Sequence, residues 1–213
     1  MKEAYILGAG GFAKEVHLLI KRNKQYNFQG FIVFNSNEDS IKIGSQLFPV
    51  IDENFFLKNN QSKKDIVIFI GMGDPSTIKK VTEKFKDFTF PNLMSPCVEI
   101  DESVSFGVGN IITKGVNFTV DINVGSFNIF NLNMTIGHDT VIGNYNVMNP
   151  GATISGNVTI GDGNLLGTGS TILQNLSISN NNIIGGNGLL SKNVLNDKVM
   201  IGVPCKELIK AGN

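Results

Sequence analysis

The sequence predicts an α/β domain followed by a parallel β-helix. From residue 100 to residue 190, an apolar residue recurs at every sixth position. A fixed six-residue period is typical of a parallel β-helix, and neither an α-helix nor an alternating strand has it. The apolar positions of this phase are Ile100, Phe106, Ile112, Phe118, Val124, Phe130, Ile136, Ile142, Met148, Ile154, Ile160, Leu166, Ile172, Ile178, Ile184 and Leu190.

A second period of eighteen residues lies inside the first. Asparagine occurs two residues before every third apolar position, at Asn110, Asn128, Asn146, Asn164 and Asn182. Side chains two residues apart share one face of a strand, so these amides should also point inward. Because eighteen is three times six, we expect a three-sided coil with the amides stacked along one edge and hydrogen-bonded as a ladder.

The first 95 residues have a different pattern. Short apolar strands are expected at residues 4–7, 29–34 and 65–71, and helices at residues 14–22 and 75–88. This alternation favours a small, Rossmann-like parallel sheet. Two prolines, Pro91 and Pro96, flank the change of period. We therefore place the α/β domain at residues 1–95, and the β-helix with a C-terminal tail at residues 96–213.

A glycine-rich turn joins the first strand to the first helix. Gly8, Gly10 and Ala13 match G-x-G-x-x-A. Glycines allow close approach of a phosphate, which the helix N-terminus stabilises. The second strand ends in Asn35 rather than in the acid that binds the ribose of a dinucleotide, which favours another phosphate-bearing nucleotide over NAD. A tight turn without a ligand remains the alternative.

A second candidate binding region, besides the glycine-rich turn, follows the third expected strand. Ligands of open α/β sheets bind at the carboxyl ends of the strands. We call these two binding regions rims. The residues expected to bind substrate at the two rims are Gly8, Gly10, Gly11, Phe12, Asn35, Gly73 and Asp74.

The chain has only two histidines. His17 lies in the first expected helix, and we expect it at the surface or boundary of that helix, without a catalytic role. His138 stands between Gly137 and Asp139 in the repeat region. Imidazole can accept a proton at neutral pH, and a neighbouring carboxylate can set its tautomer. We therefore favour a catalytic role for His138 over a merely exposed position at a corner of the coil.

Composition limits the possible partners and location. The net charge is zero and there is no basic run, which argues against nucleic acid as a partner. No apolar stretch reaches the ~20 residues that a membrane span needs. The N-terminus lacks the pattern of a signal peptide, and Cys97 and Cys205 form no motif. These features predict a cytoplasmic protein with reduced thiols.

Four segments together resemble the sugar acyltransferases of the left-handed β-helix superfamily. They are residues 8–16 (GAGGFAKEV), the hexapeptide repeats, residues 137–143 (GHDTVIG) and residues 201–206 (IGVPCK). The chain is most similar to the bacterial N-acetyltransferases of nucleotide-linked amino sugars and to the sialic-acid O-acetyltransferases. The resemblance implies a left-handed coil, a homotrimer, acetyl-CoA as co-substrate without a metal, and a role in polysaccharide biosynthesis. It also implies that residues 1–95 hold a nucleotide-linked sugar.

The resemblance also implies roles for single residues. His138 corresponds to the general base, Asp139 to its acidic partner, and Gly156 to the glycine whose N–H contacts the acetyl carbonyl. The groove for acetyl-CoA corresponds to Gly156, Gly167, Gly185, Gly186, Lys192 and Lys206. The chain departs from the family at residues 33–35, where members often carry two acids. It departs again at residues 146–149, where some members carry another histidine.

The predicted function is therefore acetyl-CoA-dependent N-acetylation of a nucleotide-linked amino sugar, by direct transfer with a histidine base. O-acetylation of sialic acid or a related sugar is the alternative, and a purely structural β-helix is the third possibility. A γ-type carbonic anhydrase would need three histidines for each zinc ion. A sugar-phosphate nucleotidyltransferase would need a larger N-terminal domain.

Overall fold

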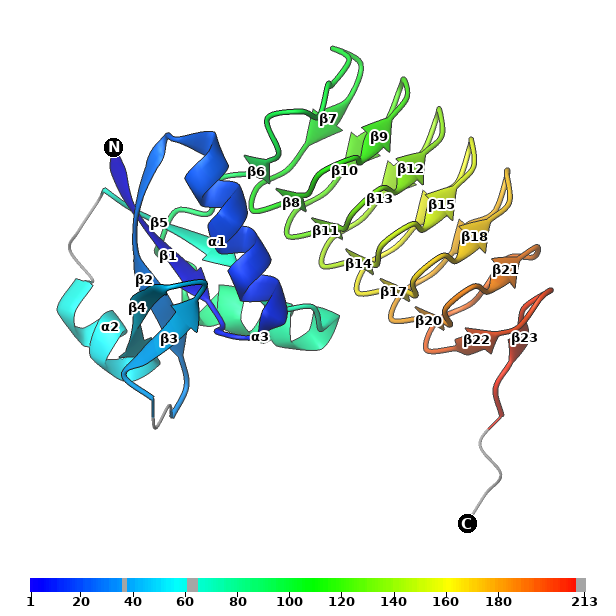
Figure 1. Ribbon diagram of the computed structural model, residues 1–213. Helices are drawn as coiled ribbons and strands as arrows, with labels where there is room; N and C mark the ends of the chain where they lie inside the picture. Colours follow the sequence, from blue (N-terminus) through cyan, green and yellow to red (C-terminus); the bar gives the residue numbers. More distant parts are fainter. Residues whose placement is uncertain (36–37, 61–64, 210–213) are drawn as a thin grey trace.

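The computed structural model describes residues 1–35, 38–60 and 65–209. An N-terminal α/β domain packs against the first coils of a parallel β-helix, whose later coils extend away from it (Figure 1). The predicted fold class, an α/β domain followed by a parallel β-helix, is confirmed. In the described part of the chain, no helix is both long and apolar enough to cross a bilayer.

The N-terminal sheet has the strand order β3-β4-β2-β1-β5. The bounds are β1 (Lys2–Leu7), β2 (Tyr26–Val33), β3 (Ser40–Ile43), β4 (Gln46–Asp52) and β5 (Ile66–Ile70). The three predicted strands β2, β1 and β5 are parallel, as expected. Strand β4 adds to this sheet parallel to β2, and β3 pairs antiparallel with β4. The sequence pattern did not predict this hairpin, because no residue of β4 is fully buried and its apolar signal is correspondingly weak.

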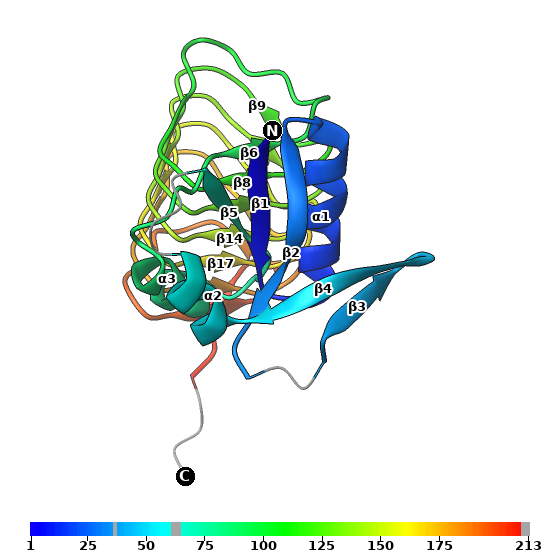
Figure 2. The same cartoon turned by 90° about the vertical axis from the view of Figure 1, so that its left-hand side faces the viewer.

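Helix α1 (Gly11–Asn23) covers one face of the sheet, and α2 (Glu53–Asn60) and α3 (Pro75–Lys84) lie on the other (Figure 2). Helix α2 was not predicted. Helix α1 starts three residues earlier than expected, and α3 ends at Lys84 rather than at residue 88.

His17 was expected at the surface or boundary of its helix, and the structure buries it instead. Its side chain is buried, with 8% exposed, and its ring centroid lies 4.4 Å from that of Phe48 and 4.7 Å from that of Phe28. The helical period places residue 17 on the same face as the buried Ala13 and Ile20. Burial lowers the pKa of His17 below its usual value, and the nearby Lys21 lowers it further.

This burial predicts a loss of stability on mild acidification. Because the pKa of His17 is lower in the folded chain than in the unfolded chain, the unfolded chain binds the proton first as the pH falls below about 6.5. Stability should therefore decrease between pH 7 and pH 5.5. We expect His17→Phe to flatten the dependence of Tm on pH in this window. Equal slopes for the wild type and His17→Phe would contradict the assignment.

The β-helix is a three-sided coil of short strands, most of them two residues long. From residue 106 to residue 190, each apolar position of the hexad is the second residue of a strand, and all of them except the partly buried Phe106 are buried. Sheet 1 consists of β6 (Leu93–Met94), β8 (Ile111–Ile112), β11 (Ile129–Phe130), β14 (Val147–Met148), β17 (Leu165–Leu166), β20 (Ile183–Ile184), β22 (Val199–Ile201) and β23 (Lys206–Glu207). Sheet 2 consists of β9 (Asn117–Phe118), β12 (Thr135–Ile136), β15 (Thr153–Ile154), β18 (Thr171–Ile172) and β21 (Leu189–Leu190). Sheet 3 consists of β7 (Ser105–Phe106), β10 (Asn123–Val124), β13 (Val141–Ile142), β16 (Thr159–Ile160) and β19 (Ser177–Ile178).

The predicted asparagine ladder is present inside the edge where sheet 3 meets sheet 1. All five side chains are fully buried. The amide nitrogen of Asn146 donates to Oδ1 of Asn128 at 3.0 Å, and the amide nitrogen of Asn164 donates to Oδ1 of Asn146 at 3.0 Å. Each Oδ1 also accepts the backbone N–H of the asparagine one coil later, at 2.8–2.9 Å for these pairs. The ladder satisfies polar groups that would otherwise be buried without partners.

The N-terminal domain is fixed to sheet 1 by apolar packing. The outward-facing Ile111, Ile129 and Val147 are buried and belong to the core of the N-terminal domain. Strand β6, next to the proposed domain boundary, pairs with β8. Since the domain covers sheet 1, the edge where sheet 2 meets sheet 3 lies on the opposite side of the prism. We call this edge the 2–3 edge, and the edge where sheet 1 meets sheet 2 the 1–2 edge.

Candidate active site

His138 lies on the 2–3 edge, between β12 and β13. Its Nδ1 is 2.7 Å from Oδ2 of Asp139, and both side chains are about 60% exposed (61% and 59%). Asp139 has a left-handed backbone conformation, with φ at 57°. The backbone is held by the adjacent coils, because the carbonyl of His138 accepts the N–H of Asn157 at 2.7 Å and Asp139 donates its N–H to Val120 at 3.2 Å. With Nδ1 engaged by a carboxylate, Nε2 is the ring nitrogen available to accept a proton.

Gly156 lies one coil beyond His138 on the same edge. A Cβ added to Gly156 would come within 2.5 Å of Nε2 and 2.6 Å of Cε1 of His138. The imidazole therefore occupies the space that a side chain at position 156 would fill. Among the hydrogen bonds of the described residues, none uses the backbone N–H of Gly156. This edge thus combines a proton acceptor with an unpaired N–H donor, which is the pairing that acyl transfer requires.

The other residues expected to contact acetyl-CoA divide between two edges of the prism. Lys192 comes two residues after β21, as His138 comes two residues after β12, so it lies on the 2–3 edge with His138 and Gly156. Gly167, Gly185 and Gly186 follow the sheet 1 strands β17 and β20, so they lie on the 1–2 edge. Lys206 is in β23, at the end of sheet 1. One chain therefore does not gather all of these residues into one groove.

The glycine-rich turn lies at the carboxyl ends of β1 and β2. Gly8 has φ at +100° and donates its N–H to the carbonyl of Ile32 at 2.8 Å. Gly10 is the N-cap residue of α1, and no side chain caps this helix. A Cβ at Gly10 or Gly11 would meet nothing within 4 Å, so the turn is open on its outer side. Phe12, in contrast, is partly buried against the core of the domain.

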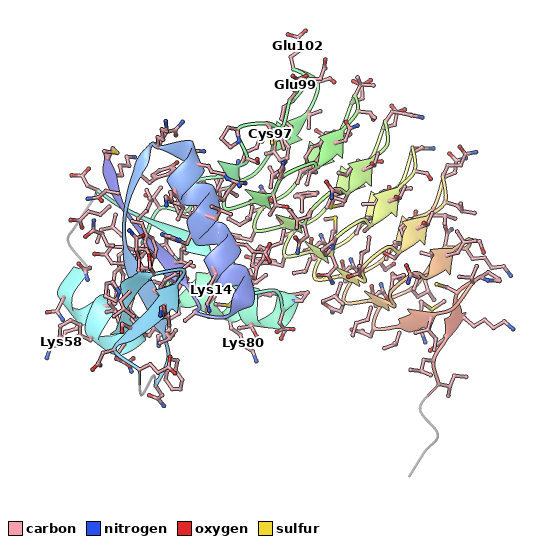
Figure 3. All side chains as sticks on the ribbon, in the orientation of Figure 1. Lys14, Lys58, Lys80, Cys97, Glu99 and Glu102 are labelled. Carbon is pink, nitrogen blue, oxygen red and sulfur yellow. The ribbon has the colours of Figure 1, made fainter. Side chains whose placement is uncertain are left out.

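Two lysines flank this end of the domain. Figure 3 shows Lys14 on α1 and Lys80 on α3, whereas Cys97 lies at the distant start of the coil. Uncapped N–H groups at the start of α1, together with nearby positive charge, suit a phosphate group. The geometry of the turn therefore agrees with the anion-binding role expected from its sequence.

The second rim borders a cavity between α3 and the coil. Asp74 is the N-cap residue of α3, and its Oδ1 accepts hydrogen bonds from the backbone N–H and the hydroxyl of Thr77 at 2.8 and 2.5 Å. These bonds hold the pKa of Asp74 below its usual value. Asp74, Lys79 and Lys80 face Tyr145 and Asp162 of the coil across a cavity of about 620 Å³. Gly73 precedes Asp74, and a Cβ there would meet nothing within 4 Å.

Sequence reasoning missed one unusual surface residue. Phe34 follows β2 and is 65% exposed, and Nζ of Lys84 lies 5.9 Å from the centroid of its ring. Asn35, the expected substrate contact, comes next with φ at 49°. The signal in the sequence that could have identified Phe34 is a large aromatic residue directly after a buried strand, at a position where a polar residue is usual.

Comparison with known proteins agrees with this architecture. Residues 3–85 match the family model of the PglD N-terminal domain. No curated protein sequence matches the chain.

Solved structures match the whole chain. The acetyltransferase domain of PglB from Neisseria gonorrhoeae is 23% identical with a TM-score of 0.88, and the match covers 98% of this chain and all of that one. PerB from Caulobacter crescentus, solved with CoA and GDP-perosamine, is 23% identical with a TM-score of 0.87 and covers 98% of both chains. WeeI from Acinetobacter baumannii is 25% identical with a TM-score of 0.85, covering 98% of this chain and all of that one.

The match of the N-terminal domain and the fold of the whole chain agree with the resemblance to hexapeptide-repeat sugar acyltransferases that the sequence indicates. The coil is a left-handed parallel β-helix, as the resemblance implied.

Proposed function

We propose that this protein is an acetyl-CoA-dependent N-acetyltransferase that acts on a nucleotide-linked amino sugar. The observation that carries the proposal is the arrangement on the 2–3 edge, where Nδ1 of His138 is engaged by Asp139 and Nε2 lies over Gly156. The similar PerB structure holds CoA and GDP-perosamine, and a similar PglB structure holds acetyl coenzyme A, which supports both substrate classes.

The chemistry needs no covalent intermediate on the protein. As the sugar amine attacks the thioester carbonyl, its nitrogen forms the new amide bond and transfers a proton to Nε2 of His138. The carboxylate of Asp139 keeps Nδ1 protonated and stabilises the imidazolium that forms. The N–H of Gly156 stabilises the oxyanion. When the carbon–sulfur bond breaks, the imidazolium of His138 gives up its proton and CoA leaves as the thiol, which returns His138 to its neutral form.

We further propose that the active protein is a homotrimer and that each site lies between two subunits. Within one chain, the N-terminal domain covers sheet 1, whereas His138 is on the opposite 2–3 edge. The residues expected at the acetyl-CoA groove occupy two different edges. Closed cyclic symmetry would bring one subunit's 2–3 edge against its neighbour's 1–2 edge and N-terminal domain. Light scattering at micromolar concentration should give the trimer mass, and a monomer mass would contradict this arrangement.

The activity is tested by measuring the release of the CoA thiol from acetyl-CoA. The acceptors are UDP-, dTDP- and GDP-linked amino sugars, with the corresponding sugars lacking the amine as matched controls. We expect thiol release and an amide product only with an amino sugar. An ester product with sialic acid or CMP-sialic acid would favour O-acetylation. If no acceptor is acetylated, the acetyltransferase proposal is wrong and a purely structural β-helix is favoured.

Replacement of Gly10 separates the two substrate sites. A Cβ at this position would meet no protein atom within 4 Å, so we expect Gly10→Val to fold normally while blocking the approach of a phosphate to the turn. The Kd for the sugar nucleotide should rise at least ~10-fold, and the Kd for acetyl-CoA should not change. Isothermal calorimetry measures both values. A parallel loss of both affinities, or of neither, would show that the turn does not hold the nucleotide.

A further inference from the structure

Phe34 presents an aromatic ring to solvent at the carboxyl edge of the N-terminal sheet. Its side chain is 65% exposed, although the preceding residues of β2, Phe31 and Ile32, are buried. Single exposed apolar side chains are common on protein surfaces, so exposure alone assigns no role to the ring, and its neighbours have to be considered.

The ring lies beside the glycine-rich turn. Strand β2 is parallel to β1, with Leu7 paired to Ile32, and Gly8 donates its N–H to the carbonyl of Ile32. Phe34 therefore follows directly after the residues that flank the turn. In open α/β sheets that bind a phosphate at the first turn, the nucleoside lies over the end of the second strand, where an acid usually holds the ribose. Here that place is taken by a ring that has no hydrogen-bonding group.

A fixed cation supports the ring. Val33 pairs with Asp52 in β4, which places Phe34 next to Glu53 at the start of α2. The carboxylate of Glu53 is buried and forms an ion pair with Nζ of Lys84, the last residue of α3. This pair holds Nζ 5.9 Å from the centroid of the Phe34 ring, within the range of a cation–π contact.

A nearby phenylalanine provides the comparison. Phe55 is exposed to a similar extent, 63%, yet among the described residues no aromatic ring or cation contacts its ring. Exposure alone therefore does not explain the Phe34–Lys84–Glu53 arrangement, which joins three separate elements of the domain.

We propose that Phe34 is the platform on which the base of the nucleoside diphosphate stacks, with Lys84 held in place by Glu53. This inference rests on the proposed function and adds the way in which the nucleotide is recognised. Every base has an aromatic face, so a platform without hydrogen-bonding groups binds purines and pyrimidines alike, with stronger binding of the larger purines. In this arrangement the glycine-rich turn binds the phosphates.

The first test compares ligands with and without a base. We expect Phe34→Ala to weaken binding of GDP and UDP by about 5- to 100-fold in calorimetry, the usual effect of removing a stacking side chain. Binding of inorganic pyrophosphate should not change. Phe34→Tyr should retain wild-type affinity, because it keeps the ring, and Phe55→Ala should behave as wild type.

The second test uses the absence of tryptophan from the chain. In Phe34→Trp, the only indole would lie on the platform, so GDP should quench its fluorescence and pyrophosphate should not. Phe55→Trp is the matched control and should not respond to either ligand. The platform is overturned if Phe34→Ala binds GDP as tightly as wild type, or if GDP binds without changing the emission of the tryptophan at position 34.

These outcomes are separable from failure of the proposed function. If GDP or UDP binds through Phe34 but no amino sugar is acetylated, the proposed role of Phe34 is supported and the acetyltransferase proposal is wrong. If acetyl transfer occurs and the Phe34 variants keep their nucleotide affinity, only the platform fails. If the wild-type protein binds no nucleoside diphosphate, both proposals are wrong.

Discussion

Replacing His138 with alanine should lower kcat by about 10²- to 10⁴-fold, the usual contribution of a positioned general base. The fold should persist, because the side chain is mostly exposed and its backbone bonds to neighbouring coils do not involve the imidazole. Affinity for acetyl-CoA should also persist. The measurement is steady-state thiol release, accompanied by Tm and by calorimetry with acetyl-CoA. The kcat of Asp139→Asn should lie between those of the wild type and His138→Ala, since this variant keeps the imidazole but removes the carboxylate beside Nδ1.

The same variant tests whether each site is shared between subunits. Trimers assembled from equal amounts of His138→Ala and Gly10→Val chains would contain about one quarter of sites with an intact turn from one chain and an intact histidine from the other. Activity at low sugar-nucleotide concentration should then rise to ~25% of wild type, well above the mean of the two parent variants. Activity equal to that mean would place the turn and the histidine of each site in one chain.

Adding a single methyl group at Gly156 should lower kcat by about 10²-fold, an effect typical of a reacting group displaced by about 1 Å. The new Cβ would overlap Nε2 and Cε1 of His138, and the ring is the part that can move. Gly156→Ala keeps its backbone N–H, so this loss reports the position of the imidazole rather than the donor to the oxyanion.

A double variant makes that assignment testable. If Gly156→Ala acts only by moving the imidazole, adding it to His138→Ala should cause no further loss of kcat. Independent, multiplicative losses would show that position 156 acts through something other than His138. Unchanged kcat in the single Gly156→Ala variant would contradict the geometry of the edge.

The coil was predictable from the sequence because apolar residues recur in its core at an unbroken six-residue period. Each hexad position faces the same environment, so the strands, the buried asparagines and the three sheets follow from two periods. His138 stood out because it is the only histidine in a repeat of small and apolar residues.

The N-terminal domain was less predictable because its features depend on tertiary contacts. His17 is buried only because Phe28 and Phe48, from β2 and β4, surround it, and β4 itself has a weak apolar pattern. The environment of Phe34 requires an ion pair between α2 and α3, which no local pattern encodes. The division of the expected acetyl-CoA residues between two edges also emerges only when the coil is folded.

The asparagine ladder has a consequence for the dynamics of the chain. The bonds along the ladder join each amide to the coils directly before and after it, so the β-helix behaves as a one-dimensional stack that opens from its free end. At that end the spacing falls from eighteen to sixteen residues, and the amide nitrogen of Asn182 is buried without a partner among the described residues. Amide hydrogen exchange should therefore be fastest in the last coil and slowest near His138 and Gly156, whose coils have neighbours on both sides. The reacting groups thus sit in the most rigid segment, whereas the tail that carries Lys206 belongs to the part that opens first.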